Sequence, residues 1–157
     1  MKEEIIESEG ISRGQEMSKV IGENSLPRLA KALENLRTLK LTIFHLPYRE
    51  LSPNSCVHWA VKARVARAQR EETGWLAKIE WQPLMPMKHA TISYTFVVKD
   101  KRHRDLDNLI SACKSFQDGL IDAGVLESDN SQHLTLVQCN VMQGEAEQTI
   151  ITLNEVK

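Results

Sequence analysis

Residues 91–123 read TISYTFVVKDKRHRDLDNLISACKSFQDGLIDA, and this stretch decides the fold class. Its first eight residues alternate in the manner of a β-strand with one buried face, formed by Ile92, Tyr94, Phe96 and Val98. From about residue 108 to 123, apolar residues recur at spacings of four, three and four, which predicts a helix. Its apolar face consists of Leu109, Cys113, Phe116 and Leu120. A strand followed by a helix predicts an α/β or α+β domain.

Patterns on either side of this stretch predict the rest of the sheet. Residues 39–43 alternate as a strand. Residues 132–142 and 148–156 predict two more strands, joined through 143–146 as an antiparallel hairpin. We therefore expect a small mixed sheet of four to five strands, packed with two main helices.

The other helix is expected from about His58 to Glu72, and it is rich in cations. Thr73-Gly74 is expected to end it. Residues 75–81 alternate as a strand would, although a helical interpretation of residues 75–79 stays open as an alternative. Gly124 is placed to end the later helix in the left-handed conformation, with the next residue packing back on Leu120.

The length of 157 residues suits one domain with an extension. Residues 1–37 predict a partly helical or disordered N-terminal extension, with a short amphipathic helix at 27–37, and residues 38–157 predict the folded domain.

A hydrophobic fraction of 41% and a charged fraction of 26% argue against disordered and membrane classes. No apolar run approaches the roughly 20 residues of a membrane span. The net charge of -1 offers no bulk attraction for nucleic acid, and three widely spaced cysteines indicate a cytoplasmic protein.

Acidic residues beside the expected helix start are the candidate metal-binding and catalytic residues. On an extended chain, Asp105 and Asp107 would point the same way and could share a cation. Lys114 lies two helical turns after Asp107, and a reversal after the helix could bring Asp129 back toward the first two acids. Such a group suits Mg²⁺-dependent phosphodiester hydrolysis. A helix start that is merely capped by an aspartate explains the same residues, and the spacing leaves that alternative open.

Two segments resemble a known family. Residues 102–109 read RHRDLDNL and are followed by Lys114, Asp118-Gly-Leu, Ala123-Gly-Val-Leu and Ser128-Asp129. Residues 51–64 read LSPNSCVHWAVKAR. In this order they resemble the RusA family of Holliday-junction resolvases, which are often phage-borne and act in DNA recombination and repair. The resemblance spans about residues 38 to 140.

The resemblance implies a homodimer that binds a four-way DNA junction and makes paired nicks with Mg²⁺, or with Mn²⁺ as a substitute. It assigns Asp105, Asp107 and Asp129 to the metal and Lys114 to catalysis. Some relatives carry the lysine about one turn earlier, where this chain has Ser111. The family commonly has two adjacent aspartates in the turn, where this chain has Ser128 before Asp129; a slip of one residue would place Asn130 at the essential position.

The same resemblance gives a role to basic and polar residues outside the acidic group. The expected DNA contacts are Arg102, Arg104, Lys62, Arg64, Arg67, Asn54, His58 and Trp59. Three rival interpretations stay open. They are a nuclease for other branched DNA such as flaps or forks, a catalytically inactive junction-binding protein, and an unrelated α/β protein with a capped helix.

Overall fold

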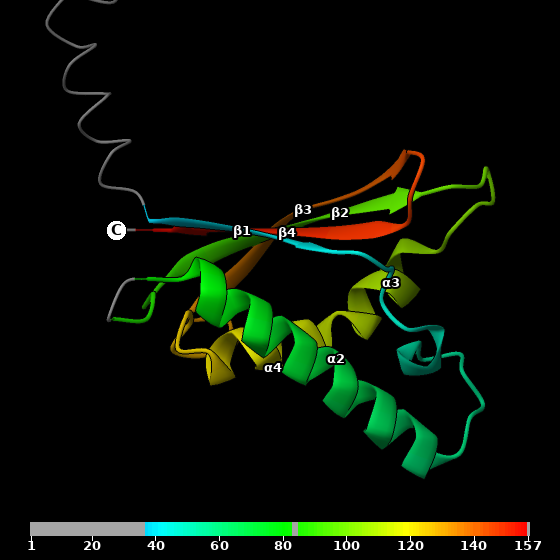
Figure 1. Cartoon of the computed structure of the whole chain (residues 1–157), viewed down its shortest axis with the longest axis horizontal. Coiled ribbons are helices and arrows are strands. Elements are labelled where there is room, and N and C mark those ends of the chain that lie inside the picture. The colour runs from blue at the N-terminus through cyan, green and yellow to red at the C-terminus, as the bar shows by residue number, and fades with distance from the viewer. Residues whose placement is uncertain (1–36, 83–84, 157) are drawn as a thin grey trace, which may run out of the picture. The chain divides into compact units, whose positions relative to one another are not determined.

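The computed structural model describes residues 37–82 and 85–156, so the expected extension and its helix at 27–37 lie outside the described residues, apart from Arg37. The elements are β1 (Thr38–Ile43), the 3-10 turn η2 (Arg49–Leu51), α2 (Trp59–Glu80), β2 (Ala90–Val98), α3 (Leu106–Ala112), α4 (Lys114–Asp122), β3 (Leu134–Gln143) and β4 (Gln148–Glu155). The fold is α+β: one four-stranded mixed sheet carries the helices on one face (Figure 1). Across the described residues, no helix has the length and apolar character needed to cross a membrane.

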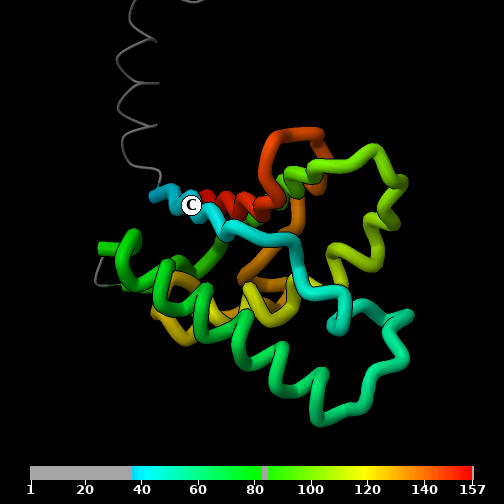
Figure 2. The backbone as a smooth tube through the Cα atoms, turned by 45° about the vertical axis from the view of Figure 1, so that its right-hand side comes forward, coloured from blue at the N-terminus to red at the C-terminus, as the bar shows by residue number. Residues whose placement is uncertain are grey.

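The strand order is β1-β4-β2-β3, so the expected hairpin between the last two strands is wrong. Both strands form, but β2 lies between them: β3 pairs with β2 in parallel, and β4 pairs antiparallel with β1 and β2. The chain leaves β2 through α3 and α4 before it returns as β3, which is the connection that parallel neighbours require (Figure 2). Gly144 then carries the chain across the end of β2, where its N–H donates to the Val98 carbonyl at 2.9 Å. A Cβ at this glycine would lie 2.4 Å from Cγ1 of Val97.

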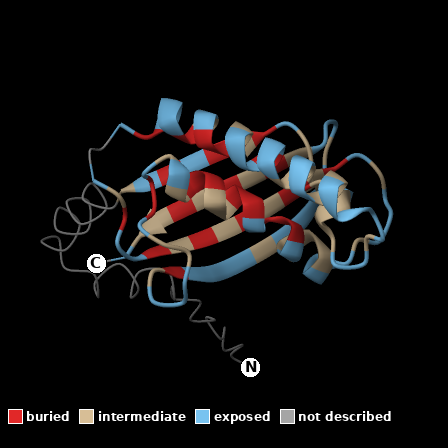
Figure 3. Ribbon diagram, turned by 90° about the horizontal axis from the view of Figure 1, so that it is seen from below, coloured by how far each residue is buried: buried red, intermediate tan, exposed pale blue. Residues whose placement is uncertain are grey.

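The core forms between the sheet and the helices, as the alternation of the strands predicts. In β2 the residues at 92, 94, 96 and 98 are all buried, and in β1 the buried positions are 39, 41 and 43. Phe116 and Leu120 of α4 are fully buried against this face, where red positions of sheet and helices meet in Figure 3. Both predicted strands and the apolar face of the predicted helix are confirmed.

Helix α2 continues through Thr73-Gly74 to Glu80, so the expected break and the strand at 75–81 are wrong. Both Thr73 and Gly74 are buried in the interface with α4. A Cβ at Gly119 of α4 would lie 2.5 Å from the Arg70 carbonyl oxygen and 2.9 Å from Cβ of Thr73. The glycines therefore allow two helices to cross closely rather than ending one of them. The apolar alternation of 75–81 resolves into a buried face at Ala77 and Trp81 and an exposed face on the other side of the helix.

The predicted helix over 108–123 begins at Leu106 and is divided at Cys113 into α3 and α4. The division has a tertiary cause. Gln69 of α2 is fully buried, and its Nε2 donates to the Ala112 carbonyl and to Ser115 Oγ, both at 2.8 Å. The carbonyl of the last residue of α3 thus accepts a hydrogen bond from the Gln69 side chain.

The predicted stop at Gly124 is confirmed. Its φ is +73°, and its N–H and that of Val125 donate back to the carbonyls of Ile121 and Leu120. This paired bonding satisfies the last carbonyls of α4. Val125 is buried in the same core cluster as Leu120.

Candidate functional site

Asp105 is the N-cap of α3. Its backbone is extended, with φ −78° and ψ 114°, and its Oδ1 accepts from the N–H of Asp107 at 3.1 Å. Asp107 lies inside the first turn of α3, so the expectation that both acids sit on extended chain holds for Asp105 alone. Helix capping therefore explains the position of Asp105. It does not explain Asp107, whose carboxylate is exposed and has no hydrogen-bond or ion-pair partner in the described part of the chain.

Asn108 connects the two segments that carry the resemblance. Its Nδ2 donates to Oδ2 of Asp105 at 2.9 Å. Its Oδ1 accepts from Oγ of Ser52 at 3.1 Å and from Nδ2 of Asn54 at 3.2 Å. These contacts bring the LSPN segment against the start of α3, where η2 also packs (Figure 2). Ser52 and Asn108 are site residues that the sequence did not single out, and only their position inside the two quoted segments hinted at a role.

Lys114 and Asp129 are in contact, whereas the sequence led us to expect Asp129 beside Asp105 and Asp107. The Nζ of Lys114 lies 2.5 Å from Oδ2 of Asp129 and 2.5 Å from Oδ1 of Asp118. Partial burial acts to lower the pKa of Lys114, but the hydrogen bonds to Asp118 and Asp129 outweigh it and the pKa is raised. The lysine is therefore a cation at neutral pH, held by two carboxylates.

The three expected metal acids are not gathered into one group. In the described ranges, no cluster of three or more His, Cys, Asp or Glu side chains is arranged to hold a metal ion. Asp105 and Asp107 lie at the start of α3, whereas Asp129 is engaged by Lys114 at the start of α4. The first two acids still fit Mg²⁺ chemically. Each oxygen of Asp105 accepts one described hydrogen bond and keeps acceptor capacity, and Mg²⁺ in proteins often uses one or two carboxylates with substrate phosphate and water.

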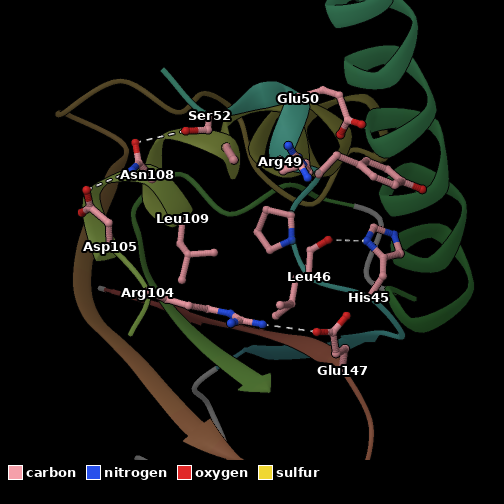
Figure 4. Close-up of a pocket in the computed structure, with 13 residues that line it drawn as sticks. His45, Leu46, Arg49, Glu50, Ser52, Arg104, Asp105, Asn108, Leu109 and Glu147 are labelled. Carbon is pink, nitrogen blue, oxygen red and sulfur yellow. Dashed lines mark hydrogen bonds and ion pairs between the residues drawn. The ribbon is translucent and has the colours of Figure 1, made fainter. Parts of the chain in front are cut away.

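A cavity of about 620 Å³ opens beside Asp105. Its walls include Tyr48, Arg49, Ser52, Arg104, Asn108 and Leu109 (Figure 4). Its lining mixes apolar and polar side chains and includes Asp105, but not Asp107.

The two arginines that precede the acids differ in availability. Arg104 pairs with Asp100 at 3.0 Å and with Glu147 at 3.3 Å, and its side chain is 17% exposed. Arg102 is 85% exposed, with Asp100 at 3.7 Å. Arg102, with one long ion pair, is therefore more accessible to a phosphate than Arg104, which two carboxylates hold in the wall of the cavity.

The remaining expected DNA contacts lie on α2 and the loop before it. Lys62, Arg64 and Arg67 have no carboxylate partner among the described residues, unlike Arg70, which pairs with Asp122. At the N-terminus of α2, the N-cap is His58, whose Nδ1 accepts from the Ala60 N–H at 3.2 Å. The neighbouring Trp59 is 75% exposed, and Asn54 is exposed while bonded to Asn108. None of these residues belongs to the core cluster.

No protein-family model matches this chain, and no curated protein sequence does. Solved structures with some similarity include thiamine monophosphate kinase from Aquifex aeolicus, at 15% identity over 88% of this chain and 44% of that chain, with a TM-score of 0.31. Another is the hydrogenase maturation protein HypE with ATP, at 11% identity over 93% of this chain and 42% of that chain, with a TM-score of 0.35. This chain spans less than half the length of these proteins. At such TM-scores the likeness carries no argument about this chain.

Proposed function

We propose that this protein is a Mg²⁺-dependent, RusA-type endonuclease that cleaves branched DNA, with the four-way junction as its substrate. The supporting observation is the contact of Ser52 and Asn54 with Asn108. Two segments that resemble the same family, far apart in sequence, meet at the acids expected to do the chemistry.

Asp105 and Asp107 would hold the metal; the resemblance assigns Asp129 as the third acid, although in the structure this residue pairs with Lys114 instead. When bound, Mg²⁺ supplies Lewis-acid stabilisation of the scissile phosphate and activation of water. Lys114, as a cation, would stabilise the charge that develops on the phosphate oxygens. Arg102 would orient the DNA strand, and the loop before α2 with the cations of α2 would follow the phosphates of a junction arm.

A homodimer follows from the proposed reaction, because two opposed nicks related by a two-fold axis need two sites related in the same way. A cytoplasmic location in a cell that recombines or repairs DNA suits this activity. Cys56, Cys113 and Cys139 are all free thiols.

A junction-binding protein without cleavage is the second candidate. It is favoured by the ion pair of Asp129 with Lys114 and by the separation of this acid from those of α3. Cleavage of flaps or forks instead of four-way junctions keeps the same chemistry and changes only the substrate.

The test incubates full-length protein with a labelled four-way junction, a flap, a fork and a matched linear duplex, in Mg²⁺ or EDTA. The matched variants are Asp107→Asn and Asp122→Asn, which remove one carboxylate each from the start of α3 and from the end of α4, where Asp122 pairs with Arg70 outside the site. We expect paired nicks in the junction alone, lost in EDTA and in Asp107→Asn but retained in Asp122→Asn. Junction binding should survive or tighten in Asp107→Asn, because a repulsive charge near phosphate is gone.

Wild-type cleavage by Asp107→Asn would overturn the assignment of the acids. Tight junction binding without cleavage under any metal condition would favour the binding protein. Nicks confined to the flap or the fork would show that this DNA structure, and not the four-way junction, is the substrate.

A further inference from the structure

We propose that Asn108 is a positioning residue that holds the carboxylate of Asp105 in its working orientation; the inference rests on the proposed function. The two ends of an amide side chain differ, because the oxygen only accepts hydrogen bonds and the nitrogen only donates. Ser52 and Asn54 both donate to the oxygen of Asn108. The nitrogen is thereby turned toward Asp105, to which it donates at 2.9 Å (Figure 4).

The carboxylate of Asp105 is held at both oxygens. Oδ2 accepts from Asn108, and Oδ1 accepts from the backbone N–H of Asp107. An ionised carboxylate has about four acceptor positions, so two described bonds leave capacity for a cation while restricting rotation of the group. Asn108 thus supplies what capping alone does not, a second fixed point for Asp105.

No simple replacement at position 108 reproduces this arrangement. An apolar residue would leave the Ser52 and Asn54 donors without their acceptor and Oδ2 of Asp105 without its donor. A carboxylate would place an oxygen against Oδ2. The LSPN segment therefore acts on the acids through Asn108 and makes no described hydrogen bond to Asp105 itself.

The test uses the full chain and Mn²⁺ as the probe, followed through paramagnetic broadening of the backbone amide NMR signals of Asp105 and Asp107. Residues that orient a metal ligand typically affect metal affinity or activity by 10- to 100-fold. We expect Asn108→Ala to raise the Mn²⁺ concentration at half-maximal broadening by about tenfold and to lower kcat for junction cleavage by about 10- to 100-fold. The junction Kd should stay within about twofold of the wild-type value, because Asn108 holds a ligand rather than DNA.

Asn140→Ala is the matched control, because Asn140 is an exposed asparagine of β3 outside this network. The double variant Ser52→Ala/Asn54→Ala leaves Asn108 in place but removes both donors, so its Mn²⁺ binding and kcat should approach those of Asn108→Ala. Its junction Kd is not part of the comparison, because Asn54 is itself an expected DNA contact. Ser52→Thr keeps a hydroxyl and should behave as wild type. These upstream variants also decide the question if Asn108→Ala does not fold.

Wild-type Mn²⁺ binding and cleavage in Asn108→Ala and in the double variant would overturn the inference, as would a loss confined to the junction Kd. Absence of Mn²⁺ broadening at Asp105 and Asp107 in the wild-type chain would overturn it as well. A wild-type chain that binds Mn²⁺ there but leaves the junction intact would overturn the proposed function alone. In that case the Mn²⁺ comparison among variants still decides the role of Asn108.

Discussion

The Nζ of Lys114 lies 2.5 Å from Oδ2 of Asp129, so one ion pair joins the first turn of α4 to the loop before β3. Asp118 shares the same amino group from one turn further along α4. The lysine side chain is 61% exposed, which leaves this triad open to a charged ligand. It is the part of the candidate site whose charges the structure defines most completely.

Lys114→Met should lower the rate of junction cleavage by roughly 10²- to 10³-fold, the usual effect of removing one group that stabilises developing charge. Junction binding should change little. Lys114→Arg keeps the positive charge and should retain more activity, and Lys88→Met, at an exposed lysine outside the site, is the control. Equal cleavage by Lys114→Met and the wild-type chain would remove this lysine from the chemistry.

The same pair predicts a pH dependence of stability. Because the folded-state pKa of Lys114 is raised, its stabilising contribution is complete below about pH 10.4, the ordinary value for lysine, and is lost as the pH rises through the folded-state pKa. The difference in free energy of unfolding between the wild-type chain and Lys114→Met should be at most about 1 kcal/mol, since the pair is exposed. Urea denaturation at pH 7, 9 and 11 measures it. If this difference in free energy of unfolding grew from pH 9 to pH 11, the predicted loss of stabilisation at high pH would be wrong.

Asp129 rather than Asn130 should be the essential residue of the turn. Asn130 uses its Oδ1 to accept from the Gln132 N–H at 2.9 Å, which shapes the loop, whereas Asp129 faces Lys114. We expect Asp129→Asn to lose at least about 100-fold in cleavage rate, a loss of the size seen when one charged group of a site is removed. Asn130→Ala should cost only about 1 kcal/mol in stability, measured by denaturation, with cleavage near wild type. The opposite pattern would place Asn130 at the family's acidic position.

The unpaired cations of α2 should control how strongly junction binding depends on salt. Each phosphate contact removed lowers the slope of log K against log salt by about 0.9 for duplex arms. The triple variant Lys62→Ala/Arg64→Ala/Arg67→Ala should therefore show a visibly shallower slope in a titration of binding against salt concentration. Lys40→Ala, on the exposed face of β1, is the control. An unchanged slope in the triple variant would show that this part of α2 lies away from DNA.

Gly119→Ala should destabilise the fold by about 1–3 kcal/mol, because the added Cβ meets the Arg70 carbonyl at 2.5 Å and forces the two helices apart. Gly74→Ala is the matched control: its nearest contact is 3.4 Å, and alanine is the better helix former by about 1 kcal/mol. Thermal or urea unfolding distinguishes the two. Equal stability of the two variants would mean that the crossing is looser than these distances indicate.

Local sequence determined the elements whose pattern is read within one segment. The alternation in β1 and β2, the apolar face at 109–120 and the stop at Gly124 all depend on backbone geometry and on burial of one face, which neighbouring residues specify. The acids and Lys114 could be proposed for the same reason, since their spacing relative to a helix start is local. A turn after the helix was expected to bring Asp129 toward Asp105 and Asp107, but Asp129 pairs with Lys114 instead, a contact that the local pattern did not predict.

Only the tertiary structure decided the features that depend on a second segment. Strand pairing is set by which edges meet across the whole sheet, so residues 134–143 and 148–155 flank β2 instead of pairing with each other. Gln69 ends α3 at Ala112 from another helix, and two glycines that could have ended helices let them cross. The hydrogen bond from Ser52 to Asn108 also depends on a second segment. A hydrogen bond between side chains far apart in sequence leaves no periodic trace in either segment, because its partner is chosen by packing of the whole fold.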